Sequence, residues 1–302
     1  MSSDLISVIV PTFSRSEMLP RALTSILNQS YKNFEIIVVD DNGMGSLDQE
    51  STYQSIIKFL DNTNVRYVAH EKNLGGSEAR NTGIRNAEGR YITFLDDDDE
   101  YYVSKLETQL KFYQDKFPDD NGFINGQIDV AKNGKIVRTT KSSVEYDHLL
   151  FSAVSEKILG TPTFFIPKEI LVKNGGFPII AKGQEWYLSV KLIEAGYSFQ
   201  SMCDSLVKVN IHNEGSIFDG NKSNEKQLGG LNAIYEIQKS YFEFFNIKQQ
   251  HHIKYKHCLA LARSYSKNNL LLSIRWLIKS LRYGFPQRDF VAVSYHIFLC
   301  RR

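Results

Sequence analysis

The segment from residue 90 to residue 99 reads Arg90-Tyr91-Ile92-Thr93-Phe94-Leu95-Asp96-Asp97-Asp98-Asp99. Its apolar, β-branched and aromatic first part is typical of a buried strand, and four carboxylates follow at once. Four adjacent like charges are unfavourable unless a cation or hydrogen bonds neutralise them. A hard divalent cation is one solution and a solvated acidic loop is the alternative.

The preceding residues predict three more strands that alternate with helices. Short apolar runs are typical of buried strands, and apolar residues at helical spacing predict amphipathic helices. Strands alternating with helices indicate βαβ units and a parallel sheet. The strands are predicted at 5–10, 35–39 and 65–69, and the helices at 17–29, 49–60 and 76–87.

Polar residues follow three of these strands at the point where each strand ends. They are Pro11 to Arg15, Asp40-Asp41, and Asp96 to Asp99. Open parallel sheets bind ligands at the carboxyl ends of their strands, so we expect one site there, and its position favours the metal interpretation of the acidic run. Asp40-Asp41 also precedes Asn42-Gly43, and turn chemistry is the alternative explanation for that pair.

A glycine-containing segment, Asn73-Leu74-Gly75-Gly76-Ser77, precedes the helix that carries Arg80. Backbone N–H groups at such a helix start can bind a phosphate. Arg80 could pair with a diphosphate or form a salt bridge within the protein.

The rest of the chain predicts a mixed second half followed by helices. We expect one α/β domain over residues 1–220 and a helical, basic region over residues 221–302. The predicted elements are helices at 101–114 and 184–195, two strands within 122–140, strands at 164–166 and 205–211, and helices near 229–245, 250–266, 269–283 and 287–300.

Several motifs in this order resemble family 2 glycosyltransferases, which have the GT-A fold. The resemblance covers about residues 5–215 and is carried by Ile6 to Phe13, Ser25 to Tyr31, Glu35 to Asn42, and Asn73 through Asp99. It implies a Rossmann-like nucleotide-binding sheet with a mixed second half, here with a C-terminal helical extension.

The resemblance also implies roles for single residues. Pro11, Thr12 and Phe13 would flank the nucleobase, and Asp41, with Asp40, would bind uracil or ribose. Asp96 and Asp97 would lie beside ribose and sugar, and Asp98 would ligate Mg2+ or Mn2+. The nucleotide-sugar-binding set also includes Gly75 and Arg80.

Two further motifs of the family occur downstream. Gly183-Gln184-Glu185-Trp186 resembles the catalytic Glu-Asp-Trp motif, with Glu185 where the family usually has Asp. This implies that Glu185 is the general base; the alternative is an exposed acid in the first turn of a helix, favoured by the helix dipole. His212, in a segment resembling the family's closing segment, would reach the metal or diphosphate, although a lone histidine is often structural.

Charge is unevenly distributed although the net charge is only +2. Residues 251–302 contain ten Lys or Arg residues and one acid. Aromatic and aliphatic residues lie among them, so we expect residues 250–302 either to contact an anionic membrane or to pack as a helix with a solvated basic face. No nucleic-acid-binding module is recognisable.

Cysteine usage and hydropathy suggest an intracellular location. Cys203, Cys258 and Cys300 are far apart and form no CxxC pair, so neither a zinc knuckle nor a disulfide framework is indicated. No stretch approaches the ~20 apolar residues that span a bilayer. We expect a cytoplasmic protein that can lie at the inner face of the cell membrane.

Taken together, these features predict an inverting, metal-dependent hexosyltransferase. It would move a hexose from a nucleotide-sugar, with UDP as the expected nucleotide, to a saccharide or lipid-linked saccharide in cell-surface polysaccharide synthesis. The main alternative is a non-catalytic nucleotide-sugar-binding protein on the same fold. A sugar nucleotidyltransferase is disfavoured, because Pro11 to Ser14 is not a glycine-rich loop.

Overall fold

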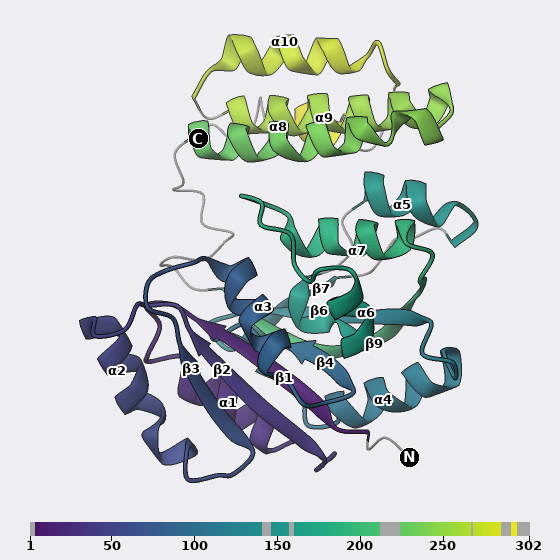
Figure 1. Cartoon of the computed structure of the whole chain (residues 1–302). Coiled ribbons are helices and arrows are strands. Elements are labelled where there is room, and N and C mark those ends of the chain that lie inside the picture. Colours follow the sequence, from purple (N-terminus) through teal and green to yellow (C-terminus); the bar gives the residue numbers. More distant parts are fainter. Residues whose placement is uncertain are drawn as a thin grey trace. The chain divides into compact units, whose positions relative to one another are not determined.

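The computed structural model describes residues 4–140, 146–156, 160–211, 224–266, 268–284 and 291–294 (Figure 1). The chain divides into two compact units. The first, the sheet unit, comprises Met1–Glu145, Lys157–Ile180 and Gln184–Ser216, and the second, the helical unit, comprises Tyr146–Glu156, Ala181–Gly183 and Ile217–Arg302. The boundary at residue 220 stays a prediction, because residues 212–223 lie outside the described residues.

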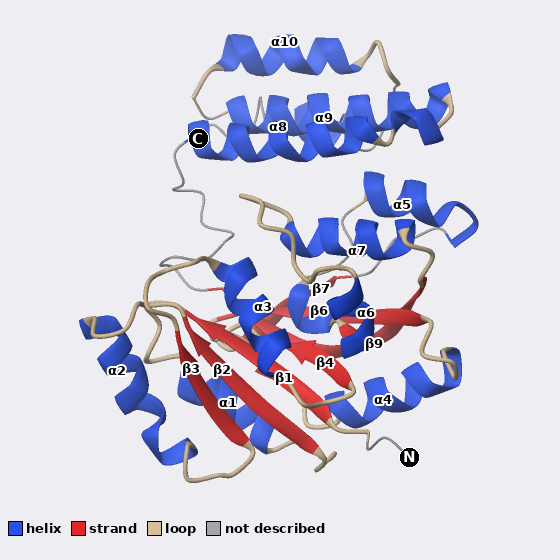
Figure 2. Ribbon diagram, viewed as in Figure 1, coloured by secondary structure: helices blue, strands red, loops and turns tan. Residues whose placement is uncertain are grey.

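The sheet unit is built on a mixed sheet whose first four strands are parallel (Figure 2). Their order across the sheet is β3-β2-β1-β4. The alternation of strands and helices explains this arrangement, because each crossover returns the chain to the same edge. These strands are β1 (Ile6–Thr12), β2 (Phe34–Asp40), β3 (Val65–Ala69) and β4 (Tyr91–Phe94).

The second half of the sheet is mixed, as predicted. The order continues from β4 through β8, β6 and β9 to β5, and β7 pairs with β6. The β8 strand is antiparallel to β4 and β6, whereas β6 and β9 are parallel. The bounds are β5 (Glu100–Tyr101), β6 (Gly122–Lys132), β7 (Lys135–Thr140), β8 (Phe165–Pro167) and β9 (Ser198–Ile211).

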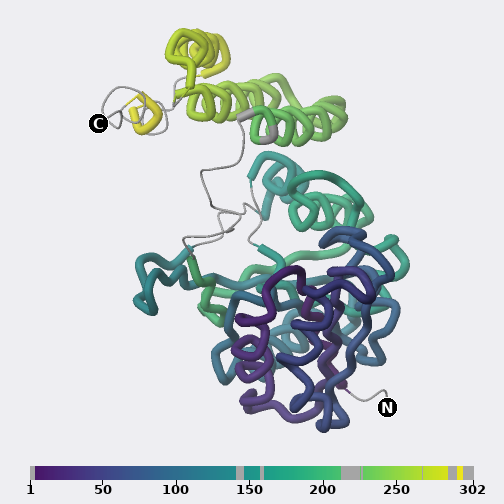
Figure 3. The backbone as a smooth tube through the Cα atoms, turned by 90° about the vertical axis from the view of Figure 1, so that its left-hand side faces the viewer, coloured from purple at the N-terminus to yellow at the C-terminus, as the bar shows by residue number. Residues whose placement is uncertain are grey.

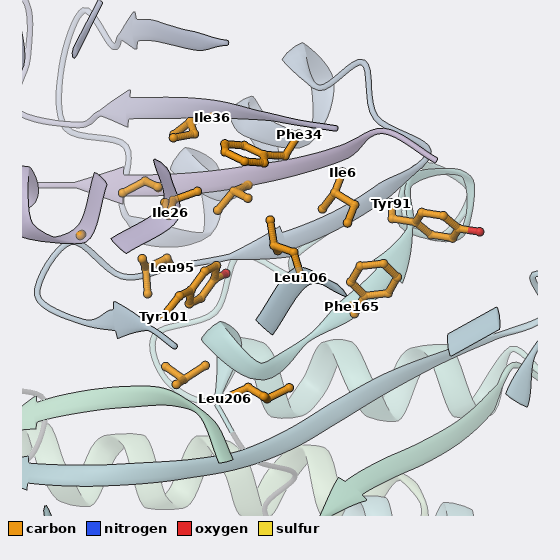
Figure 4. Close-up of a cluster of buried hydrophobic side chains, with 14 of the residues drawn as sticks. Ile6, Ile26, Phe34, Ile36, Tyr91, Leu95, Tyr101, Leu106, Phe165 and Leu206 are labelled. Atoms are coloured by element: carbon orange, nitrogen blue, oxygen red, sulfur yellow. The ribbon is translucent and has the colours of Figure 1, made fainter. Parts of the chain in front are cut away.

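Helices cover both faces of the parallel strands, so side chains from both faces of β1 are buried. Ile6, Val8 and Val10 pack in one core cluster with α1 and α4 (Figure 4), whereas the Ile9 side chain meets α3. This alternation is the period of two expected of a strand. The helices of this unit are α1 (Leu19–Leu27), α2 (Leu47–Ile56), α3 (Gly76–Asn86), α4 (Lys105–Lys116), α6 (Lys168–Lys173) and α7 (Gln184–Glu194), with short 3-10 turns η1 (Ile57–Phe59) and η3 (Thr161–Thr163).

Some element bounds differ from the sequence predictions. The helix predicted over 101–114 begins at Lys105, because Glu100 and Tyr101 pair with Lys208 and Val207 of β9 as a short strand. The strand predicted over 205–211 extends back to Ser198, and ladder pairing with β6 supports this added length. Both differences arise from pairing between distant segments, which local sequence patterns do not report.

The helical unit is centred on α9, which contacts both α8 and α10 (Figure 3). Tyr255, Leu259 and Ala262 of α9 pack with Leu277 of α10, and the Ser273 hydroxyl donates a 2.6 Å hydrogen bond to the Ala262 carbonyl. A capping box at Asn246 starts α9. The elements are η2 (Tyr146–His148), α5 (Leu149–Ser155), α8 (Asn224–Ser240), η4 (Phe242–Phe244), α9 (Ile247–Tyr265) and α10 (Leu270–Ser280).

The outward face of α10 combines aliphatic and basic side chains. Leu271 and Ile278 are 82% and 61% exposed, and Arg275, Lys279 and Arg282 are exposed beside them. Only residues 291–294 of the helix predicted over 287–300 are described, and they are helical. Within the part of the chain that the structure covers, no helix has the length and apolarity needed to cross a membrane.

The contact between Gly83 of α3 and Ile9 of β1 provides a test of the packing. A Cβ at Gly83 would overlap the Ile9 side chain, whereas a Cβ at Gly229 of α8 would have no atom within 4 Å. Gly83→Ala is expected to lower the free energy of unfolding by about 1–3 kcal/mol through overpacking. Gly229→Ala is expected to raise it by up to about 1 kcal/mol through helix propensity. Urea unfolding of both variants checks this, and equal changes would contradict it.

Candidate active site

The loops after β1 and β4 meet at the carboxyl edge of the parallel strands. The Thr12 hydroxyl donates a 2.7 Å hydrogen bond to the Asp97 carboxylate. Arg15 Nη1 lies 3.0 Å from Asp97 Oδ1 and 2.7 Å from Asp98 Oδ2. Two segments more than 80 residues apart in sequence therefore contribute to one cluster of charge, at the edge where the sequence predicted a site.

Asp97 is the most enclosed member of this cluster that binds Arg15. Asp97 is 3% exposed. Burial raises the pKa of its carboxyl to about 6, although Arg15 and Thr12 act to lower that pKa. Arg15 and the Thr12 hydroxyl compensate only part of the cost of burying the charge. Phe13, whose backbone N–H lies 3.4 Å from the same carboxylate, is 51% exposed at this edge.

Asp96 is held by a different arginine. Arg80 of α3 places Nη2 2.6 Å from Asp96 Oδ1, and its guanidinium lies 5.6 Å from the Phe177 ring centroid. The sequence left open whether Arg80 binds a diphosphate or forms a salt bridge. The structure contains the salt bridge, and among the described residues the buried Arg80 Nε has no hydrogen-bond partner.

Asp99 fixes the acidic loop to the end of β9. It is buried, and its Oδ1 accepts a 3.0 Å hydrogen bond from the Asn210 backbone N–H. The Asn210 side chain donates to the Asp98 carbonyl at 3.1 Å. Burial and the neighbouring carboxylates raise the pKa of Asp99 well above its ordinary value. This anchor brings the chain to within two residues of His212, which lies outside the described residues.

Asp41 organises the loop between β3 and α3. Its carboxylate accepts from the backbone N–H groups of Leu74 at 2.7 Å and Gly75 at 2.8 Å, and from His70 Nδ1 at 2.8 Å. The φ of +89° at Gly75, which favours glycine, turns its N–H toward this carboxylate. The contact is internal to the protein, so the parts of Asp41 and Gly75 in ligand binding stay predictions.

Asp40 is completely buried beside Asp41. It accepts hydrogen bonds from the Tyr67 hydroxyl at 2.6 Å and the Asn42 backbone N–H at 2.9 Å. Burial raises the pKa of Asp40. The hydrogen bond from Asn42 is the turn contact that the sequence analysis gave as the alternative explanation for Asp40-Asp41. The structure therefore contains this turn contact next to a pair of buried acids.

Glu185 lies in the first turn of α7 and is half-buried. Within the described residues its carboxylate forms no ion pair, and its backbone carbonyl accepts from the Ser189 hydroxyl at 3.0 Å. Among the described residues, which exclude His212, no hydrogen bond joins Glu185 to another predicted site residue. Pro11 pairs with Val39 in the ladder between β1 and β2, next to Thr12.

Four contacts at the site were not assigned from the sequence. They involve Arg15, Arg21, His70 and Asn210. Arg21 Nη2 donates to the Asp98 carbonyl at 2.8 Å. A basic residue in the loop after the first strand was the one available signal, and it pointed to Arg15; the other three depend on contacts between distant segments.

Asp96 and Asp98 have the properties that a divalent-metal ligand requires. Their side chains are 25% and 14% exposed, and carboxylate oxygens suit Mg2+ and Mn2+. Among the described residues, no group of three His, Cys, Asp or Glu side chains could hold a metal. One or two carboxylates nevertheless suffice for Mg2+ when substrate phosphates and water complete its shell. Asp96 and Asp98 therefore fit a divalent-metal site in which substrate phosphates and water supply the remaining ligands.

The raised pKa of Asp97 predicts a stability difference that depends on pH. The folded protein binds this proton more tightly than the unfolded chain, so the group stabilises the fold fully below pH about 4, and this contribution is lost as pH rises through about 6. Asp97→Asn cannot ionise, so at pH 7 and above it should exceed wild type in free energy of unfolding by up to about 3 kcal/mol.

Urea unfolding at a series of pH values measures this difference. Asp61→Asn, at an exposed position, is the matched control and should follow wild type throughout. An Asp97→Asn advantage that persists unchanged below pH 4 would show that burial of the charge is not its cause.

Comparison with solved structures shows the fold. S. aureus TarS 1-349, in complex with UDP-GlcNAc, superposes with a TM-score of 0.60 and 18% identity, covering 98% of this chain and 91% of that one. The mannosyltransferase PcManGT from Pyrobaculum calidifontis, in complex with GDP-Man and Mn2+, gives 0.56 at 15% identity, covering 98% and 88%. The predicted GT-A fold with a C-terminal helical region is confirmed.

Relatives of known sequence include proteins of several lengths. The chain is 30% identical over 249 residues to the GalNAc(5)-diNAcBac-PP-undecaprenol beta-1,3-glucosyltransferase of Campylobacter jejuni, covering 80% of this chain and 73% of that protein. It spans only 21% to 38% of the length of three uncharacterised glycosyltransferases from Rickettsia species.

A family model provides the assignment. The model described as Glycosyl transferase family 2 matches residues 7–168, which is more than half of the chain and includes the loops after β1, β2 and β4. The chain belongs to glycosyltransferase family 2.

Proposed function

We propose that this protein transfers a hexose from a UDP-sugar to a saccharide or lipid-linked saccharide, with inversion at the anomeric carbon. The observation that carries the proposal is the meeting of Thr12, Arg15, Asp97 and Asp98 at the edge where β1 and β4 end. Carboxylates suited to a cation and a guanidinium suited to phosphate are the groups that a nucleotide diphosphate requires.

The donor would lie across the loops at this edge. Pro11, Thr12 and Phe13 would flank the nucleobase, and the exposed Phe13 ring offers an apolar surface for it. Asp40 and Asp41 would recognise uracil or ribose, and Asp96 and Asp97 would contact ribose and sugar. Gly75 and Arg80 would face the diphosphate, which requires Arg80 to exchange its Asp96 partner for phosphate oxygens.

Asp98, with His212 as a second candidate, would hold Mg2+ or Mn2+. The bound ion would supply stabilisation of the charge on the leaving diphosphate. The exposure of Asp98 and the Mn2+ in the PcManGT complex support this part of the proposal. Arg15 and Arg80 add two positive charges of the protein itself near the same phosphates.

Glu185 would accept the proton of the acceptor hydroxyl as general base. Its position in the first turn of α7 and its half-burial leave the carboxylate able to meet a substrate. The side chain is one methylene longer than the Asp usual in the family motif, so the reacting hydroxyl would lie correspondingly farther from the α7 backbone.

The acceptor would be a saccharide carried on a lipid diphosphate. The name of the C. jejuni relative, which specifies a PP-undecaprenol-linked saccharide, supports this class. An enzyme with such an acceptor would work at a membrane surface, and we expect it at the cytoplasmic face. The exposed aliphatic and basic side chains on the outward face of α10 suit the interface of an anionic bilayer.

Replacement of Glu185 tests the function directly. Glu185→Gln keeps the size and removes the base, so transfer from UDP-sugars is expected to fall by about 100-fold or more, while UDP binding stays near wild type. Glu169→Gln, another acid in the first turn of a helix, is the matched control and should keep its activity. Transfer is measured as UDP release across a panel of donors, each with Mg2+ or Mn2+. Retained transfer in Glu185→Gln would refute the assignment of the base.

Vesicle binding tests the role of α10. The double variant Leu271→Glu and Ile278→Glu is expected to bind vesicles containing phosphatidylglycerol about tenfold or more weakly than wild type, because it removes apolar contact and adds like charge. Leu47→Glu, at an equally exposed leucine of α2, is the control and should bind as wild type does. Co-sedimentation measures both, and equal binding of the two variants would exclude α10 as the contact.

A further inference from the structure

Arg15 occupies the position between two carboxylates that a cation would otherwise fill. A single nitrogen, Nη1, lies 3.0 Å from Asp97 Oδ1 and 2.7 Å from Asp98 Oδ2. The Arg15 side chain is 28% exposed, compared with 5% for Asp97 and 14% for Asp98. The guanidinium that holds the two carboxylates thus belongs to the most exposed side chain of the three.

The contact with Asp98 conflicts with the proposed metal ligation. A divalent ion on Asp98 Oδ2 would lie close to the guanidinium that now binds the same oxygen, and the two positive charges would repel each other. Metal binding at this oxygen, without nucleotide, therefore requires Arg15 to give up its contact with Asp98.

A nucleotide diphosphate changes this balance. Its oxygens offer Arg15 a bidentate partner, and guanidinium–phosphate pairs are among the stronger charge-assisted hydrogen bonds. The same phosphates complete the coordination shell of the ion. The arrival of the diphosphate thus frees Asp98 and provides the guanidinium with a new partner.

We propose that the Arg15 guanidinium competes with the metal ion for the Asp98 carboxylate until a nucleotide diphosphate binds Arg15 in place of Asp98. Arg15 thereby couples the two affinities, so that metal and nucleotide each strengthen the binding of the other. The inference rests on the proposed function, because it requires Asp98 to be the metal ligand. It assigns to Arg15 a positioning role that the family model does not state.

Arg21 is the natural comparison for Arg15. It has the same charge and contacts the same loop, but its Nη2 donates to the backbone carbonyl of Asp98 and its Nε lies 3.5 Å from Glu100. Neither contact occupies an Asp98 carboxylate oxygen. Arg15→Gln and Arg21→Gln therefore remove equal charge near the acidic loop, and only the first removes a contact from an Asp98 carboxylate oxygen.

The experiment measures the affinity of the full chain for Mn2+ from the electron paramagnetic resonance signal of the free ion, first without nucleotide and then with saturating UDP. Wild type should bind Mn2+ weakly alone and at least about tenfold more tightly with UDP, which is within the usual range of coupling between sites. Arg15→Gln should bind Mn2+ alone about tenfold more tightly than wild type, and UDP, whose phosphates still ligate the ion, should raise that affinity by a smaller factor than in wild type. Arg21→Gln should keep the wild-type coupling.

Further variants make the outcomes distinct. Arg15→Lys keeps the charge but not the bidentate guanidinium, so its Mn2+ affinity without UDP should lie between those of wild type and Arg15→Gln. This variant replaces Arg15→Gln in the test if Arg15→Gln does not fold. An Arg15→Gln affinity for Mn2+ alone that equals that of Arg21→Gln, or falls below wild type, overturns the proposal. If UDP fails to raise Mn2+ affinity in wild type and Asp98→Asn changes nothing, the proposed metal site itself is refuted along with it. Normal coupling in both Arg15 variants refutes only the role of Arg15.

Discussion

Four adjacent carboxylates at the end of β4 must be compensated for this fold to exist, and the surrounding structure is arranged to do so. Each acid has a partner, and two of them share Arg15: Arg80 binds Asp96, Thr12 and Arg15 bind Asp97, Arg15 binds Asp98, and the Asn210 backbone binds Asp99. These partners come from α3, the loop after β1, and the end of β9. Neutralising one loop therefore fixes the relation of three separate segments to the sheet edge.

The kind of partner separates fixed carboxylates from exchangeable ones. Asp41 and Asp99 accept from backbone N–H groups, which cannot move without a change in the chain. Asp96 and Asp98 are held by arginine side chains, which are 11% and 28% exposed. The first group shapes the site, and under the proposed function the second would exchange partners with a ligand. Asp97 lies between the two groups, because a buried hydroxyl and a half-buried guanidinium share it.

The sequence was sufficient for the fold because its signals were local. Apolar runs such as Ile6 to Val10, followed by polar strand ends, predict both the parallel strands and the edge where the site lies. The meeting of Thr12 with Asp97 follows from the same reasoning. The short strand at Glu100 and Tyr101 could not be predicted in this way, because it forms by pairing with β9, which lies more than 100 residues away in the chain. Which guanidinium binds which carboxylate is likewise set by packing between loops.

Hydrogen bonds within the protein already involve residues that were predicted to bind the substrate. Asp41 was predicted to bind uracil or ribose, yet three donors of the protein already bind its two oxygens. A base could add a bond only to a remaining lone pair, so recognition there would depend on the orientation that His70 imposes, and His70 is itself held by Thr82 at 2.9 Å. Since Thr82 lies on α3 with Arg80, the same helix that sets Asp41 also carries the partner of Asp96. A shift of α3 would therefore change the surroundings of Asp41 and of Asp96 together.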